Sequence, residues 1–135
     1  MALTLTDQDK STLRTAAYGA VSLLAAADAA GSPHRIATDG SIALATATGP
    51  VGHVLAEKSA VNGLDGRTVA ELADHVLPAL TAAATLLDAQ DPAEAANFRG
   101  IVDIALATAT RSRKGEPTPA MAEMTRRINE ALATA

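Results

Sequence analysis

The stretch Thr68–Ala89, TVAELADHVLPALTAAATLLDA, decides the fold of this chain. Its apolar residues recur at steps of three and four, which is the spacing of one face of an α-helix. They are Val69, Leu72, Ala73, Val76, Leu77, Leu80, Ala83, Ala84 and Leu87. Thr68 followed three residues later by Glu71 is the pattern of a capping box. We therefore expect a helix that starts at Thr68 and buries one broad apolar face against other segments.

Pro78 lies inside this predicted helix. A proline in a helix interior costs about 3 kcal/mol, because it has no N–H and its ring clashes with the preceding turn. The carbonyl that loses its donor is that of Asp74. We expect a kink at Pro78 or a break between two shorter helices.

The composition favours a single all-α domain over residues 1–135. Hydrophobic residues make up 48% of the 135-residue chain, about a quarter of all residues are alanine, and aromatic residues are only 1%. Alanine favours helices, whereas strands favour β-branched and aromatic residues. The core must therefore come from Leu, Val, Ile and Ala at close contacts between helices.

Charge and cysteine content exclude several classes of protein. The net charge is −4 and the pI is near 5.2, which disfavours a nucleic-acid partner. The absence of cysteine excludes disulfides, thiolate metal sites and a cysteine nucleophile. The N-terminus lacks the pattern of a signal peptide, and the apolar run Ala16–Ala30 is shorter than the roughly 20 residues that cross a bilayer. We expect a cytoplasmic protein with no membrane partner.

Capping residues and first-turn prolines divide the chain into five or six helices. One helix is expected from Thr6 to about Asp28, one from Asp91-Pro92 to about Arg111, and one from Thr118-Pro119 onward. Their apolar positions include Ile101 and Ile104 in the second and Met121 and Met124 in the third. The short connections between the last three helices predict antiparallel neighbours.

The segment between the first helix and Thr68 is less clear. Ser32-Pro33 starts a new element, and Arg35–Thr48 is compatible with a helix weakened at Gly40 or with a hairpin turning at Asp39-Gly40. Its alanines favour the helix. A short helix is expected from Val51 to about Lys58, followed by a surface loop over Lys58–Arg67.

Glu71, Asp74 and His75 form the best candidate ligand-binding cluster. Glu71 and His75 lie one turn apart on a helix, with Asp74 beside them, and a carboxylate and an imidazole at that spacing can share a metal or pass a proton. The alternative is a solvated helix face with a Glu–His contact. No second helix offers a matching pair, so no cofactor is expected. A zinc site would require His34, His53 and His75 to converge, which the sequence does not decide.

Other polar residues have structural interpretations. Tyr18 falls on the polar side of its helix, either with its hydroxyl in water or in a groove that takes a partner or ligand. Asn97, a poor helix former, is expected to bond to a neighbouring loop, and Arg99 to pair with Asp103. Gly49-Pro50-Val51-Gly52 has no following Lys-Ser/Thr and is not a phosphate loop.

The segments LTDQDKSTLRTAAYGAVSLLAAADAA and VLPAL…EAANFRGIVDIA resemble small all-helical actinobacterial proteins of unassigned function. The resemblance covers about two thirds of the chain. It implies a helical fold and supplies no catalytic residues.

No Gly-x-Ser-x-Gly or other catalytic pattern is present. We therefore expect a non-enzymatic interaction module that acts as a homo-oligomer, with another protein as an alternative partner. The Met121/Met124 seam favours an adaptable contact surface. The alternatives are a small-ligand or metal-binding protein or enzyme using Glu71, Asp74 and His75, and a nucleic-acid accessory protein using the basic residues Arg111, Arg113, Lys114, Arg126 and Arg127.

Overall fold

Six helices and no strand make up the described part of the chain, which confirms the all-α prediction. The structure is a computed structural model that describes residues 4–27, 33–56, 68–111 and 118–133. The helices are α1 (Asp7–Ala27), α2 (Pro33–Ala45), α3 (Gly49–Ala56), α4 (Val69–Gln90), α5 (Pro92–Arg111) and α6 (Pro119–Ala133). The loop expected over Lys58–Arg67 lies outside the described residues.

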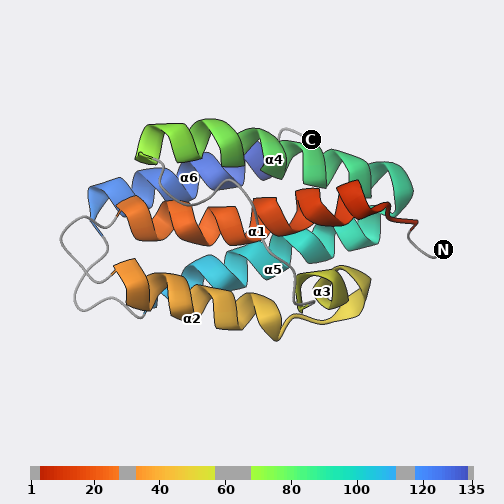
Figure 1. Cartoon of the computed structure of the whole chain (residues 1–135), viewed down its shortest axis with the longest axis horizontal. Coiled ribbons are helices and arrows are strands. Elements are labelled where there is room, and N and C mark those ends of the chain that lie inside the picture. Colours follow the sequence, from red (N-terminus) through yellow and green to blue (C-terminus); the bar gives the residue numbers. More distant parts are fainter. Residues whose placement is uncertain (1–3, 28–32, 57–67, 112–117, 134–135) are drawn as a thin grey trace.

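Helix α1 runs through the middle of the bundle and contacts every other helix (Figure 1). The five longer helices lie along one axis, and the short α3 is seen nearly end-on at one end. Consecutive helices α4, α5 and α6 alternate in direction, as their short connections predict. Buried residues from all six helices form one apolar cluster, with Phe98 among its fully buried side chains.

Both capping boxes lie where the sequence places a helix start. The Thr6 hydroxyl accepts from the Asp9 amide at 3.0 Å, and the Asp9 carboxylate accepts from the Thr6 amide at 3.1 Å. Thr68 and Glu71 make the same reciprocal pair at the start of α4, with both distances 3.1 Å. These bonds satisfy amides that the first turn of a helix leaves without an acceptor.

Pro78 does not divide α4. The helix is continuous from Val69 to Gln90 with Pro78 inside it, so of the two predicted alternatives, a kink or a break, the break is wrong. Residues before and after the proline, including Val76 and Leu80, are fully buried. Tertiary packing on both sides of Pro78 thus holds together a helix that local propensity alone would interrupt.

Helix α2 passes through Gly40 without interruption, so Asp39-Gly40 is not a hairpin turn. A Cβ atom at Gly40 would lie 2.6 Å from Cγ1 of Val21 on α1 and 3.3 Å from Cβ of Ala109 on α5. Gly40 therefore allows α2 to approach both helices closely. The residue that weakens the helix locally is the one that permits its packing.

Glycine also shapes the turn into α3. Gly49 has φ +82°, a conformation that side chains disfavour, and a Cβ at Gly52 would lie 2.6 Å from the carbonyl oxygen of Ala47. Both glycines serve the tight α2–α3 connection. Asn97 of α5 donates to the Thr48 carbonyl at 3.2 Å, which confirms its predicted bond to a neighbouring segment.

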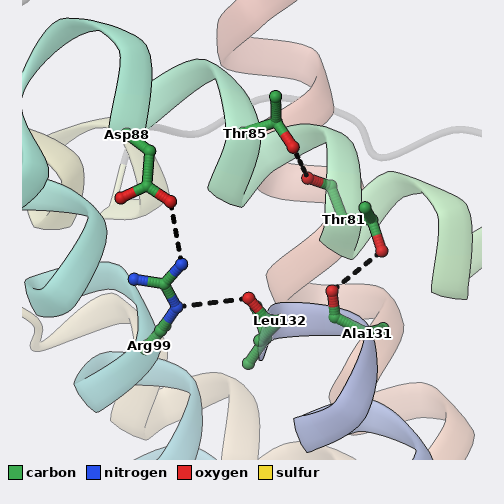
Figure 2. Close-up of polar contacts among 6 residues, drawn as sticks. All are labelled: Thr81, Thr85, Asp88, Arg99, Ala131 and Leu132. Atoms are coloured by element: carbon green, nitrogen blue, oxygen red, sulfur yellow. Dashed lines mark hydrogen bonds and ion pairs between the residues drawn. The ribbon is translucent and has the colours of Figure 1, made fainter. Parts of the chain in front are cut away.

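Side chains of α4 and α5 hold the C-terminal end of α6 (Figure 2). The Thr81 hydroxyl donates to the Ala131 carbonyl at 2.8 Å, and Nε of Arg99 donates to the Leu132 carbonyl at 3.2 Å. Nη2 of Arg99 also forms an ion pair with Asp88 at 3.0 Å. The predicted Arg99–Asp103 pair is therefore wrong, because Arg99 points toward the end of α6 and the adjacent helix instead.

Two predictions about apolar surfaces also change. Met121 and Met124 are buried inside the bundle, so this seam fills the core of the chain rather than forming an exposed surface. Ile104, expected on a buried face, is 63% exposed. None of the described helices is long and apolar enough to span a membrane.

Candidate functional site

His75 lines a groove between α1 and α4, which we call the His75 groove. Its volume is about 430 Å³, and the described residues lining it are Gln8, Ser11, Thr12, Thr15, His75, Pro78, Ala79 and Ala82. The α1 residues and the α4 residues each follow the spacing of one helix face. The His75 groove is therefore bounded by a hydrogen-bonding wall from α1 and a largely apolar wall from α4.

The imidazole of His75 is half-buried and its Nε2 is fully buried. No described residue forms a hydrogen bond with that nitrogen. Buried polar atoms are almost always paired, so an unpaired buried imidazole nitrogen is a notable feature of α4. It is the strongest polar signal at any of the sequence-predicted site residues.

Glu71 and Asp74 are exposed and are not among the residues that line the His75 groove. The carboxylate of Glu71 accepts the Thr68 amide in the capping box. The structure thus separates the three predicted residues by role: Glu71 stabilises the start of α4, Asp74 faces solvent, and His75 turns toward α1. The described residues that line the His75 groove include none from the segment between His34 and Lys58, which contains His53, the other described histidine of the possible zinc site.

The histidines give no sign of convergence in the described part of the chain. His53 is exposed on α3, and the side chain of His34 lies outside the described residues. Among the residues the structure describes, no group of three His, Asp or Glu side chains is placed to hold a metal ion.

Tyr18 and Arg14 occupy the face of α1 that the sequence assigns to the polar side. Tyr18 donates its hydroxyl to the Leu55 carbonyl at 2.6 Å, and Nε of Arg14 donates to the Val54 carbonyl at 3.2 Å. Both carbonyls belong to the last turn of α3, so these side chains cap that helix. Burial raises the pKa of Tyr18, and the nearby charge of Arg14 lowers it to a smaller extent. The Tyr18 hydroxyl is therefore bonded within the chain, and Tyr18 also lines a hollow beside α2.

A second groove lies between α2 and α5, and we call it the α2–α5 groove. Its volume is about 380 Å³, and its described lining residues are Ala43, Thr46, Ala47, Thr48, Ala96, Asn97, Gly100, Ile101 and Ile104. None of these residues is charged. A Cβ atom built on Gly100 meets no described atom within 4 Å, so the groove is open above this glycine.

One large apolar side chain lines this groove at the surface. Ile104, one turn from Gly100 on α5, is 63% exposed, whereas Ile42 on α2, 58% exposed, lines a separate hollow that includes Tyr18. This exposed surface is not predicted from the sequence, because the helical period places Ile104 close to the edge of the apolar stripe. The sequence feature that could have indicated this surface is the four-residue spacing of Ala96, Gly100 and Ile104, which places them along one line of α5.

The basic residues do not form an independent site in the described chain. Arg111 is exposed at the end of α5, whereas Arg113 and Lys114 lie outside the described residues. Arg126 forms ion pairs with Glu123 and Glu130 on the surface of α6. The hydrogen bond from Arg126 lowers the pKa of Glu123. Two carboxylates therefore neutralise the charge that a phosphate contact would need.

Comparison with known proteins finds no match. No protein-family model fits this chain, and no curated protein or solved structure is significantly similar to it. The resemblance to small actinobacterial proteins therefore stays a prediction, and a function must be argued from the grooves themselves.

Proposed function

We propose that this chain is a non-enzymatic helical module that forms a homodimer through the α2–α5 groove. The observation that carries the proposal is the exposed Ile104 beside the open space above Gly100. Large apolar side chains at the surface of a bundle, next to a hollow of uncharged residues, are typical of contact surfaces.

The occupant we propose is a second copy, because the surface is complementary to itself. Ala96 and Ile104 lie one turn on either side of Gly100 along α5. In a dimer with its two-fold axis at Gly100, the two α5 helices run antiparallel, and Ile104 of each copy covers Ala96 of the other. In such an isologous contact both chains use the same surface, so the assembly is complete with two chains.

Charge supports the same surface. The chain carries a net charge of −4, so two copies repel one another over most approaches. The described lining of the α2–α5 groove has no charged side chain. Contact there brings together no like charges and leaves no ion without a partner, which favours this face over the charged outer face of α6.

Sedimentation velocity over a wide range of protein concentrations tests the proposal. We expect the wild-type chain to dimerise, and Ile104→Lys to be monomeric at the same concentrations. Gly100→Leu also fills the hollow and blocks the contact, and the open space above Gly100 accommodates the new side chain without disturbing the core.

Val69→Lys is the matched control, because Val69 is another exposed apolar residue, 39% exposed, at the start of α4 and outside the described lining of the groove. It should leave the dimer intact. A wild-type chain that stays monomeric at millimolar concentration, or a dimer that Ile104→Lys and Gly100→Leu leave unchanged, would overturn the proposal.

A further inference from the structure

One wall of the α2–α5 groove is the short connection between α2 and α3 rather than a helix. Helix α2 ends at Ala45 and α3 begins at Gly49, and the three residues between them, Thr46, Ala47 and Thr48, all line the groove. We call these three residues the Thr48 wall. Because a connection lacks the regular hydrogen bonds of a helix, its position depends on the contacts that other elements make with it.

Two side chains of α5 hold this connection and the first turn of α3. Nδ2 of Asn97 donates to the Thr48 carbonyl at 3.2 Å, and Oε1 of Glu94 accepts from the Val51 amide at 3.3 Å. The Val51 amide lies in the first turn of α3, where amides have no acceptor within the helix and a negative charge is favoured. Helix α5 thus holds the Thr48 wall and also forms the opposite side of the groove.

Gly49 shows how closely the connection approaches these two side chains. It has φ +82°, and a Cβ atom at this position would lie 3.0 Å from Nδ2 of Asn97 and 3.5 Å from Oε1 of Glu94. Glycine adopts this conformation without strain and lets the backbone pass close to Asn97. The connection is therefore seated directly against Glu94 and Asn97.

We propose that Glu94 and Asn97 are positioning residues for the dimer surface, an inference that rests on dimerisation through the α2–α5 groove. They hold the Thr48 wall at the separation from Gly100 and Ile104 that admits a second copy. A surface that already has its bound shape avoids the cost of ordering on association, so loosening this wall weakens the dimer.

Glu94 separates positioning from direct contact with the second copy. Asn97 itself lines the groove, whereas Glu94 is not among the described lining residues. A change at Glu94 therefore acts on the dimer through the connection that it holds. For this reason the test is made at Glu94.

Sedimentation velocity of the full chain compares the dimer dissociation constants of the wild type, Glu94→Ala and Glu94→Gln. Glu94→Ala removes the acceptor of the Val51 amide, and we expect it to weaken the dimer about three- to tenfold, the effect of ordering the connection on association. Glu94→Gln keeps an oxygen that accepts the same bond and should dimerise nearly as tightly as the wild type. Both variants remove the same negative charge, so weakening in Glu94→Ala alone does not come from charge.

Thr81→Val is the matched control for a general loss of stability. It removes the hydrogen bond from the Thr81 hydroxyl to the Ala131 carbonyl, which lies outside the described lining of the groove, and it changes no charge. This variant should lower the stability of the fold and leave the dimer dissociation constant unchanged.

Amide hydrogen exchange, measured by NMR, follows the connection without the dimer. In the Ile104→Lys background, where the chain is expected to be monomeric, Glu94→Ala should speed exchange at the Val51 amide and Glu94→Gln should not. Unchanged exchange at Val51 in Glu94→Ala would show that Glu94 does not hold the connection, and would overturn the inference.

The dimer measurements separate this inference from the proposed function. A wild-type chain that never dimerises overturns the proposed function and this inference with it. A wild-type dimer that Ile104→Lys abolishes and Glu94→Ala leaves unchanged overturns this inference alone. Equal weakening by Glu94→Ala and Glu94→Gln, or by Glu94→Ala and Thr81→Val, has the same consequence.

Discussion

Tyr18 links α1 to the end of α3 through one hydrogen bond, and its removal has a defined cost. Tyr18→Phe deletes the hydroxyl that donates to the Leu55 carbonyl at 2.6 Å and leaves that carbonyl without this donor. We expect the free energy of unfolding at pH 7 to fall by about 1 kcal/mol. Urea denaturation of both proteins measures the difference.

The same bond should be sensitive to alkali. Burial raises the pKa of Tyr18 in the folded chain above its ordinary value, so folding favours the protonated hydroxyl. The stability it contributes is fully present below about pH 10 and is lost as the pH rises through the folded pKa. The difference between wild type and Tyr18→Phe should therefore shrink above pH 10, and a difference that grows there would contradict the interpretation.

Gly40 and Gly100 have the same sequence character, each a glycine within a helix, and opposite surroundings. A Cβ at Gly40 would lie 2.6 Å from Cγ1 of Val21, whereas one at Gly100 meets no described atom within 4 Å. We expect Gly40→Ala to destabilise the chain by about 1–3 kcal/mol, because α2 must move away from α1.

Gly100→Ala should instead stabilise the monomer by about 0.5–1 kcal/mol through helix propensity. Thermal unfolding at low protein concentration, where association is negligible, compares the two variants. Equal effects of the same sign would show that the helix contacts at Gly40 are looser than the structure has them.

At the level of helices, the end of α6 depends on Arg99 more than on the ion pairs along α6 itself. Arg99→Met keeps the apolar stem and removes the bonds to Asp88 and the Leu132 carbonyl. Because Arg99 is partly buried, we expect a loss of about 1–2 kcal/mol and faster hydrogen exchange in the last turn of α6.

Arg126→Met is the control for this effect. Arg126 contacts both Glu123 and Glu130, yet all three side chains are exposed, and exposed ion pairs contribute little to stability. Its removal should leave the exchange at the end of α6 nearly unchanged. A larger effect at Arg126 than at Arg99 would reverse this ranking.

The helices that the sequence predicts well are those whose signals are local. Thr6, Thr68, Asp91 and Thr118 each precede a helix, because capping and first-turn preferences depend on neighbouring residues alone. The interpretation of Gly40 and Arg99 depends on helices distant in sequence, so local spacing predicts a weakened helix and the wrong ion pair. Periodicity also does not show that α3 packs on Tyr18, or that Ile104 is left exposed by the described helices.

The candidate site shows the same difference between local signals, which the sequence predicts, and contacts between distant helices, which it does not. The sequence predicts that His75 shares a helix face with Glu71, but one turn is enough for the two to have different surroundings: Glu71 completes a cap and His75 lies against α1. The residues of α1 that line the groove with His75 are Gln8, Ser11, Thr12 and Thr15, an ordinary polar helix face in the sequence. Only the packing of α1 on α4 gives these uncharged side chains a common groove.

For the assembled chain, dimerisation through the α2–α5 groove predicts that stability depends on concentration. If folded chains associate and unfolded chains do not, mass action favours the folded dimer. Each tenfold rise in concentration above the dissociation constant should then add about 0.7 kcal/mol per chain, half of the 1.4 kcal/mol that corresponds to a tenfold change in an equilibrium constant. Urea midpoints measured across several decades of concentration give this slope directly.

Salt and Ile104→Lys separate this contact from other forms of association. Because the described lining of the groove is uncharged, raising the salt concentration should leave the slope intact and reduce only the general repulsion between chains of net charge −4. Ile104→Lys should unfold at one midpoint regardless of concentration. A wild-type slope that salt abolishes would assign the contact to ion pairs instead, and the charged outer face of α6 would then become the surface to mutate.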